Sequence, residues 1–317
     1  TKLDNEKAME KRSKSDLYTL VLERIIQIDT KQTWSMTDSI FRSAMVKAEV
    51  AEKYPQAKLE FRSWLTPVFL TTPMSSRAEF AGVRTAILGS LWMVGIAILF
   101  ALPIGTGAAV YLQEYASKNL LNRIIQTNIN NLAGVPSIVY GMLGLAIFVR
   151  ALEPFTSGSM FGVTDSNGRT ILSAGLTMGT LVLPLIIINA QEAIKAVPDS
   201  LRQAAYGVGA TRWQTVWHHV LPNALPGILT GSILAVSRAI GETAPLIVVG
   251  ASTFINIDPE GPFSKFTALP IQIYQWTTRA QSEFHAIAAS AIIVLLILLL
   301  SLNATAVLLR NRVQRKY

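Results

Sequence analysis

The sequence contains no cysteine and few histidines, and each absence excludes a kind of chemistry. Without cysteine the chain can form no disulfide, no thiolate metal site and no cysteine nucleophile. The three histidines, at positions 218, 219 and 285, leave little for a metal centre. No GxxxxGK[ST] segment occurs, so the chain has no P-loop of its own, and no apolar stretch contains HExxH or GxSxG. The sequence therefore favours neither a nucleotide-binding nor a hydrolytic protein.

Charge is also scarce. Only 15% of the residues are charged, whereas 50% are hydrophobic and the mean hydropathy is +0.38. An ordinary soluble protein has about 25% charged residues, so this composition indicates a membrane protein. The net charge of +8 would fit a nucleic-acid partner, but the basic residues do not gather with aromatic residues on one polar segment. We therefore expect a lipid environment and no nucleic-acid partner.

Five apolar stretches are long enough to cross a bilayer core of about 30 Å as helices. They lie near Thr85–Leu112, Asn131–Leu152, Thr170–Ile188, Leu225–Gly250 and His285–Leu309. The tail 310–317, the loop around Lys118 and Arg123, and the loop 191–224 are basic. The loops 153–169 and 253–284 each contain one more acidic than basic residue. The positive-inside rule places the basic loops and the C-terminus in the cytoplasm.

An odd number of spans then places residues 1–84 outside the cytoplasm. This polar segment precedes the first apolar stretch and shows no cleavable signal, which suggests a sixth span upstream of the given sequence. Helical spacing of apolar residues predicts helices over Asp16–Ile28 and Ser35–Lys53, the second closed by Tyr54-Pro55. Trp64–Pro73 is too short and too rich in proline to span. We interpret 1–84 as a small helical extramembrane segment and 85–317 as the transmembrane domain.

The fourth apolar stretch carries two charges. Arg238 falls near its middle, where an ionised side chain costs at least about 2.5 kcal/mol and usually faces a protein interior or a water-filled path. Glu242 lies one helical turn further on, on the same face. Ser237 and Thr243 flank the pair and could donate hydroxyl hydrogen bonds. The pair predicts a substrate pathway; an ion pair that only holds helices together is the alternative.

The loop 191–224 has the pattern of two short capped helices. Ser200 with Gln203, and Thr211 with Gln214, fit the capping-box spacing. Gly209 lies between them and can end the first helix in a left-handed conformation, and Pro222 is expected to stop the second. Small residues on the first helix would let a partner approach closely. A docking hairpin is thus predicted, with a hairpin lying on the bilayer surface as the alternative.

The same loop resembles the EAA motif of ABC-importer permeases, which has the form EAA, three residues, Gly, nine residues, I-x-LP. Here Gln203-Ala204-Ala205 precedes Gly209 by three residues, and His219-Val220-Leu221-Pro222 follows after nine. Gln203 replaces the usual Glu, and His219 replaces the usual Ile. The resemblance implies that this loop is the coupling helix that docks on an ATPase subunit. It assigns ATPase coupling to Gln203, Ala204, Ala205, Gly209, Leu221 and Pro222.

Further segments narrow the resemblance to the PstA family, permease subunits of phosphate ABC importers. They are YLQEYA at 111–116, NLAGVPSIVYGMLGL at 131–145 and SRAIGETAPL at 237–246. The resemblance covers roughly residues 80–317. It implies an all-α membrane protein, a helical bundle of the type I ABC-importer permease type. It also implies a PstC-like permease beside this chain, two PstB-like ATPases below it and a PstS-like phosphate-binding protein above it.

The resemblance gives the charged pair a role. The guanidinium of Arg238 would lower the barrier to phosphate inside the membrane, because its fork matches phosphate oxygens. Glu242 would partly neutralise Arg238 and accept a hydrogen bond from a phosphate hydroxyl, which fully ionised sulfate lacks. The expected function is a non-enzymatic phosphate permease subunit in the bacterial plasma membrane. No cofactor is expected on this chain, because a partner ATPase would bind ATP and Mg²⁺.

Two other functions stay open. The first is a permease for another oxyanion such as sulfate or molybdate, which would differ only in the pathway residues. The second is a proton-coupled secondary carrier, with the charged pair as a relay and with activity that needs no ATPase.

Overall fold

The computed structural model describes residues 32, 34, 36–61, 63–117, 119–163, 167–251 and 254–314. Within these ranges the chain is helical and contains no strand, which confirms the predicted all-α class. The chain divides into two compact units, Thr1–Arg84 with Ile273–Ala291 and Thr85–Gln272 with Ile292–Tyr317. The expected helix Asp16–Ile28 and the loop residue Lys118 lie outside the described residues. The proposed boundary between residues 84 and 85 stays a prediction.

The first unit contains short helices. α3 (Met36–Phe41) and α4 (Ser43–Lys53) cover the predicted helix Ser35–Lys53, which is interrupted at Arg42 and ends before Tyr54 as expected. α5 (Pro67–Thr71) begins with a cap in which the Thr66 hydroxyl accepts the Phe69 N–H at 3.2 Å. Phe69 packs near the fully buried Trp276, with ring centroids 6.2 Å apart. Residues 64–73 thus form a packed turn with one short helix, as their prolines indicate.

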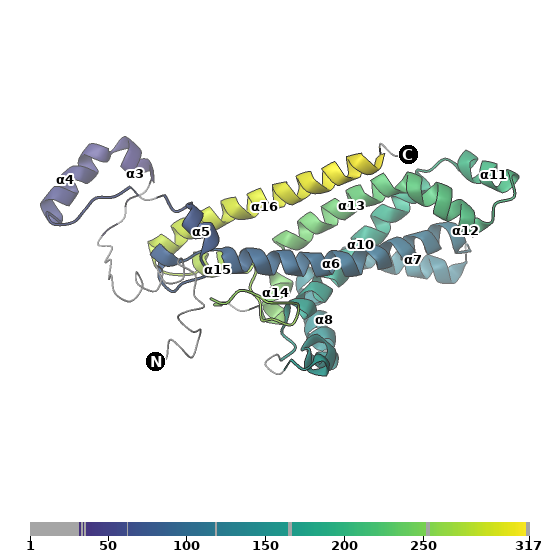
Figure 1. The fold of residues 1–317 in the computed structure, drawn as a ribbon, viewed down its shortest axis with the longest axis horizontal. Coiled ribbons are helices and arrows are strands. Elements are labelled where there is room, and N and C mark those ends of the chain that lie inside the picture. The colour runs from purple at the N-terminus through teal and green to yellow at the C-terminus, as the bar shows by residue number, and fades with distance from the viewer. Residues whose placement is uncertain are drawn as a thin grey trace. The chain divides into compact units, whose positions relative to one another are not determined.

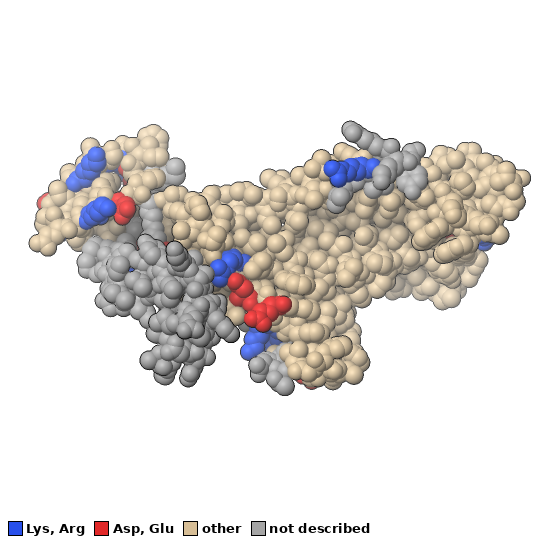
Figure 2. All heavy atoms as spheres, in the orientation of Figure 1, with Lys and Arg blue, Asp and Glu red and all other residues tan. Residues whose placement is uncertain are grey.

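Four helices are long and apolar enough to cross a membrane: Arg84–Tyr115, Ile171–Lys195, Arg212–Gly241 and Ser282–Arg312. The first joins α6 (Arg84–Val110) to the π-helical turn η3 (Tyr111–Tyr115). The second is α10 (Ile171–Lys195), and the last belongs to α16 (Ser282–Gln314). On the face drawn in Figure 2, most of the coloured surface carries neither Lys or Arg nor Asp or Glu. This surface suits a lipid environment.

The predicted span Asn131–Leu152 is not one straight helix. Asn131 belongs to α7 (Leu120–Ala133), and a bend of 104° separates α7 from α8 (Ser137–Gly144) with the π-helical η4 (Leu145–Ala151). The cause is Pro136, which lacks an N–H and sits between the two helices beside Gly134, the C-cap of α7. The segment is a broken span, so the count of five spans holds only if the bent pair counts as one.

The core of the second unit forms where α10 packs along α13 (Leu221–Gly241), and the two ribbons run side by side in Figure 1. Their buried positions include many small residues, such as Ala190, Ala235 and Ala239. Small residues let helix backbones approach closely, which favours association inside a bilayer. Shorter elements complete the described chain: η2 (Ala78–Phe80), α9 (Glu153–Thr156), η5 (Ser159–Phe161), α11 (Asp199–Gly207), α12 (Arg212–Thr215), η6 (Val216–Val220), α14 (Ala244–Val249) and α15 (Leu269–Thr277).

Candidate functional site

The charged pair lies at a break in the fourth apolar stretch. α13 ends at Gly241, Glu242 is extended with φ −77° and ψ 130°, and α14 begins at Ala244. Arg238 Nε donates to Glu242 Oε1 at 3.2 Å, so the predicted contact forms although Glu242 stands outside the helix. The Arg238 and Glu242 side chains are 41% and 20% exposed. The guanidinium is therefore accessible in this chain, and the Glu242 carboxylate is the more buried of the two groups.

The expectation of one continuous helix over Leu225–Gly250 is wrong, and Pro245 explains the break. A proline has no N–H to give to the carbonyl four residues earlier, here that of Gly241, and its ring would clash with that carbonyl. The last carbonyls of α13 consequently lack partners within the helix. Irregular backbone of this kind is tolerated at membrane depth only where protein or a water-filled cavity surrounds it.

The two residues that flank the pair point elsewhere. Ser237 Oγ donates to Asn303 Oδ1 on α16 at 2.7 Å and also approaches the Ile233 carbonyl at 2.9 Å. The hydroxyl that sequence analysis offered to substrate therefore contacts a neighbouring helix. Thr243 caps α14, and its carbonyl accepts the Ile247 N–H at 3.2 Å. Of the four pathway candidates, the structure brings only Arg238 and Glu242 into contact.

Two segments that were singled out separately meet beside this break. A Cβ added at Gly141 of α8 would lie 2.6 Å from Pro245 Cα and 3.0 Å from the Pro245 carbonyl oxygen of α14. Only glycine allows backbones to approach so closely. The Gly-rich segment 131–145 and the segment 237–246 thus form one packed unit, whose position is set by the proline that also breaks the helix.

The loop 191–224 folds largely as predicted, with one error at its start. Thr211 and Gln214 form a complete capping box, with Thr211 Oγ1 accepting the Gln214 N–H at 3.3 Å and Gln214 Oε1 accepting the Thr211 N–H at 2.9 Å. Gly209 has φ +85°, the left-handed conformation expected at the end of α11. The box predicted at Ser200 does not form, because α11 already begins at Asp199 after Pro198 and has no side-chain cap.

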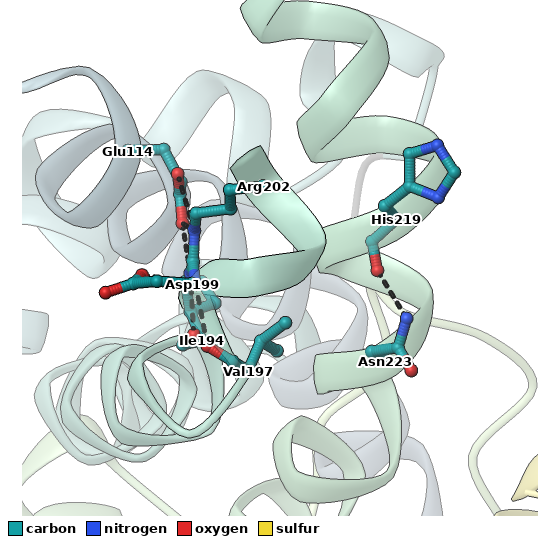
Figure 3. A network of polar contacts seen from close by, with 7 residues as sticks. All are labelled: Glu114, Ile194, Val197, Asp199, Arg202, His219 and Asn223. Atoms are coloured by element: carbon teal, nitrogen blue, oxygen red, sulfur yellow. Dashed lines mark hydrogen bonds and ion pairs between the residues drawn. The ribbon is translucent and has the colours of Figure 1, made fainter. Parts of the chain in front are cut away.

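The expectation that Pro222 stops the second helix is also wrong. α12 continues through the π-helical turn η6 into α13, so that Arg212–Gly241 forms one helix. In η6 the Leu221 N–H bonds the Val216 carbonyl five residues back, and the Asn223 side chain donates to the His219 carbonyl at 2.7 Å. This wider turn and the amide of Asn223 (Figure 3) accommodate the proline near the start of α13.

The loop leaves part of its motif accessible. Gln203, Ala204 and Gly209 are exposed, whereas Ala205 is buried against the protein. Leu221 and Pro222 are half-buried. Trp213 and Trp217 stack on each other with ring centroids 5.5 Å apart, and both remain largely exposed. A partner could therefore meet one face of α11 together with an aromatic pair that sequence analysis did not single out.

A second ion pair anchors this loop and was missed by sequence analysis. Arg202 Nη2 lies 2.7 Å from Glu114 Oε1, and its guanidinium also donates to the carbonyls of Val197 and Ile194 (Figure 3). The hydrogen bond to Glu114 raises the pKa of Arg202, which stays charged. Glu114 lies in the segment YLQEYA that carried part of the resemblance. Its charge directly after an apolar stretch was a signal, but its partner lies 88 positions away.

The described residues contain no group of three or more His, Asp or Glu side chains that could hold a metal ion. The expectation that ATP and Mg²⁺ bind a partner stays a prediction.

Comparison with known proteins gives consistent results. Residues 101–315 match the family described as "Binding-protein-dependent transport system inner membrane component". The chain is 32% identical over 256 residues to a probable ABC transporter permease protein, YqgI of Bacillus subtilis, covering 76% of this chain and 83% of the relative. It is 34% identical over 234 residues to the phosphate transport system permease protein PstA 1 of Mycobacterium tuberculosis, covering 73% and 72%.

The fold also matches a solved structure of the MetNI methionine ABC transporter. The TM-score is 0.57 at 20% identity, and the match covers 76% of this chain and 99% of that chain. At this identity the likeness concerns the fold alone. The predicted helical architecture of an ABC-importer permease is thereby confirmed.

Proposed function

Since the chain belongs to the family of binding-protein-dependent transport system inner membrane components, we propose that it forms half of the path for inorganic phosphate in an ATP-driven importer. That it is a membrane permease subunit follows from the family and from its apolar helices. The assignment of phosphate as the substrate goes beyond what the family alone shows. Its support is the PstA name of relatives that are 34% to 36% identical, together with the chemistry at the helix break.

The observation that carries the proposal is the contact of Arg238 with Glu242 at the break between α13 and α14. Phosphate brings about one and a half to two negative charges and several strong acceptor oxygens. An accessible guanidinium offers such an anion a planar fork of donors, and discontinuous membrane helices commonly form substrate sites. Glu242 would keep the anion from being held too tightly, because its charge opposes that of phosphate.

Coupling to ATP hydrolysis is assigned to α11, the left-handed turn at Gly209 and α12. Their exposed face, with Gln203 and Ala204, would fit a cleft on a PstB-like ATPase that binds ATP and Mg²⁺. A PstC-like permease would supply the other half of the path, and a PstS-like protein would deliver phosphate from outside. In this proposal the loop 191–224 and the C-terminus lie in the cytoplasm, and residues 1–84 lie on the outer side of the bacterial plasma membrane.

The test is transport by the whole assembly in liposomes. The chain is purified with the proteins that assemble on it, and ATP hydrolysis and anion uptake are measured with the binding protein plus phosphate, sulfate or molybdate. ATP-dependent uptake of phosphate alone supports the proposal. ATP-dependent uptake of sulfate or molybdate instead would assign the chain to another oxyanion. Uptake driven by a proton gradient without an ATPase would show a secondary carrier.

A further inference from the structure

The loop 191–224 is attached to the rest of the chain by packing and by the ion pair between Glu114 and Arg202, which we call the joint. We propose that the ion pair between Glu114 and Arg202 passes movement of α11 into α6, which makes both residues positioning residues for coupling. The inference rests on the proposed docking of α11 on an ATPase. It goes further by naming the route by which that movement leaves the loop.

The geometry is that of a directed, partly buried contact. Arg202 Nη2 and Nε lie 2.7 Å and 3.2 Å from Glu114 Oε1, and Nε lies 3.4 Å from Oε2, so two donors on one edge of the guanidinium engage the carboxylate. The Arg202 and Glu114 side chains are only 15% and 9% exposed. Water screens such a pair weakly, and a forked contact also fixes direction. A displacement of Arg202 therefore displaces the Glu114 carboxylate as well.

Arg202 joins three elements at one point. It belongs to α11, Glu114 belongs to η3 at the end of α6, and the carbonyls of Ile194 and Val197 lie at the end of α10 (Figure 3). The two carbonyls hold Arg202 at 3.0 Å and 2.7 Å, where a cation complements the helix C-terminus. The carboxylate is thus the contact that connects α11 with α6.

α11 buries little apolar surface. The ion pair between Glu114 and Arg202 therefore supplies a large share of what attaches α11 to the rest of the chain. Ala205 is the one residue of α11 that is buried, while Gln203, Ala204 and Tyr206 are exposed. On the other side, η3 continues α6 without interruption, in a helix that reaches back to Arg84. π-helical turns are frequent at functional sites, and this one carries the acidic residue of the joint.

The experiment uses the assembled importer in liposomes and measures phosphate taken up per ATP hydrolysed. A residue that only stabilises the fold changes the amount of assembled complex but not this ratio. Glu114→Gln removes the charge that reaches α6 and leaves the contacts of Arg202 with the two carbonyls. Glu192→Gln is the matched control, because Glu192 forms an equally short pair with Lys195 at 2.7 Å, but with both side chains more than half exposed.

We expect Glu114→Gln to lower the ratio about tenfold while ATP hydrolysis per complex persists, and Glu192→Gln to leave it unchanged. An unchanged ratio in Glu114→Gln overturns the proposal. So does a ratio that falls in Arg202→Gln alone, because coupling would then run through α10. If Glu114→Gln assembles poorly, Glu114→Asp keeps the charge on a shorter side chain; a lowered ratio supports the joint and an unchanged one overturns it.

The same assay separates this inference from the proposed function. If the wild-type complex transports another solute, only the phosphate assignment fails, and the ratio is measured with that solute. If the wild-type complex hydrolyses no ATP, both fail.

Discussion

In the proposed phosphate path, Glu242 is the residue whose charge would bear most directly on selectivity. Its carboxylate accepts a hydrogen bond from Arg238 at 3.2 Å and is 20% exposed. Glu242→Gln keeps the shape and removes the charge, so Arg238 would hold an anion more tightly, and a phosphate hydroxyl would find the weaker amide oxygen in place of a charged acceptor. We expect phosphate uptake to fall several-fold and sulfate to be admitted. Anion uptake in liposomes measures both, and normal phosphate uptake with sulfate still rejected would contradict this role.

Ser237 and Asn303 form a polar contact between α13 and α16 next to the charged pair. Hydrogen bonds between membrane helices contribute about 0.6 kcal/mol on average, because the separated helices also find partners. Ser237→Ala and Asn303→Ala should therefore each lower the free energy of unfolding slightly. The double variant should lower it by less than the sum of the two single losses. Unfolding of the detergent-solubilised protein in a double-mutant cycle measures the interaction. Strict additivity would show that the contact contributes nothing.

At the scale of elements, the turn between α11 and α12 depends on one backbone conformation. Gly209 has φ +85°, which costs a residue with a Cβ about 1–2 kcal/mol. Gly209→Ala should loosen this turn and reduce recovery of the ATPase subunit with the chain. Gly207→Ala is the matched control, because Gly207 lies in α11 with free space around its Cα and alanine favours a helix. Equal recovery of the ATPase with both variants would refute the requirement.

The contact of α8 with α14 is equally specific. A methyl group at Gly141 would meet the backbone of Pro245 at 2.6 Å, so the two helices would have to separate. Overpacking of this kind costs about 1–3 kcal/mol. We expect Gly141→Ala to lower the thermal unfolding temperature in detergent. Gly95→Ala on α6 has no atom within 4 Å of the added carbon and should leave it unchanged or raise it slightly, because alanine favours a helix. A similar effect of both substitutions would mean that the close approach is not limiting.

The sequence correctly predicted the features that depend on residues close together in the chain. The apolar runs gave the helices, and Thr211 with Gln214 and Gly209 gave the turn of the coupling loop. The errors arose at prolines, whose effect on a helix depends on the backbone and side chains around them. Pro245 and Pro136 interrupt runs that hydropathy alone reads as continuous, whereas Pro222 is tolerated because η6 widens the turn. The pair of Arg202 with Glu114 joins residues 88 positions apart, which no periodicity reveals.

At the scale of the whole molecule, the proposed orientation can be tested because the chain contains no cysteine. Val208 in the coupling loop is 86% exposed and Met160 in the loop 153–169 is 61% exposed. In intact cells with an accessible outer face of the membrane, an impermeant thiol reagent should label Met160→Cys, and it should label Val208→Cys only after the membrane is opened. Labelling of Val208→Cys in intact cells would reverse the orientation.

One helix from Arg212 to Gly241 connects the loop 191–224 with the charged pair, so a tilt at one end displaces the other end. Arg212 and Arg238 are separated by about 39 Å at about 1.5 Å per residue. A tilt of about 5° about one end would displace the other by about 3 Å, the length of one hydrogen bond. In the proposed importer, a rotation of this size imposed at the loop 191–224 would therefore make or break contacts of the Arg238 guanidinium with an anion, without any change in the helix itself.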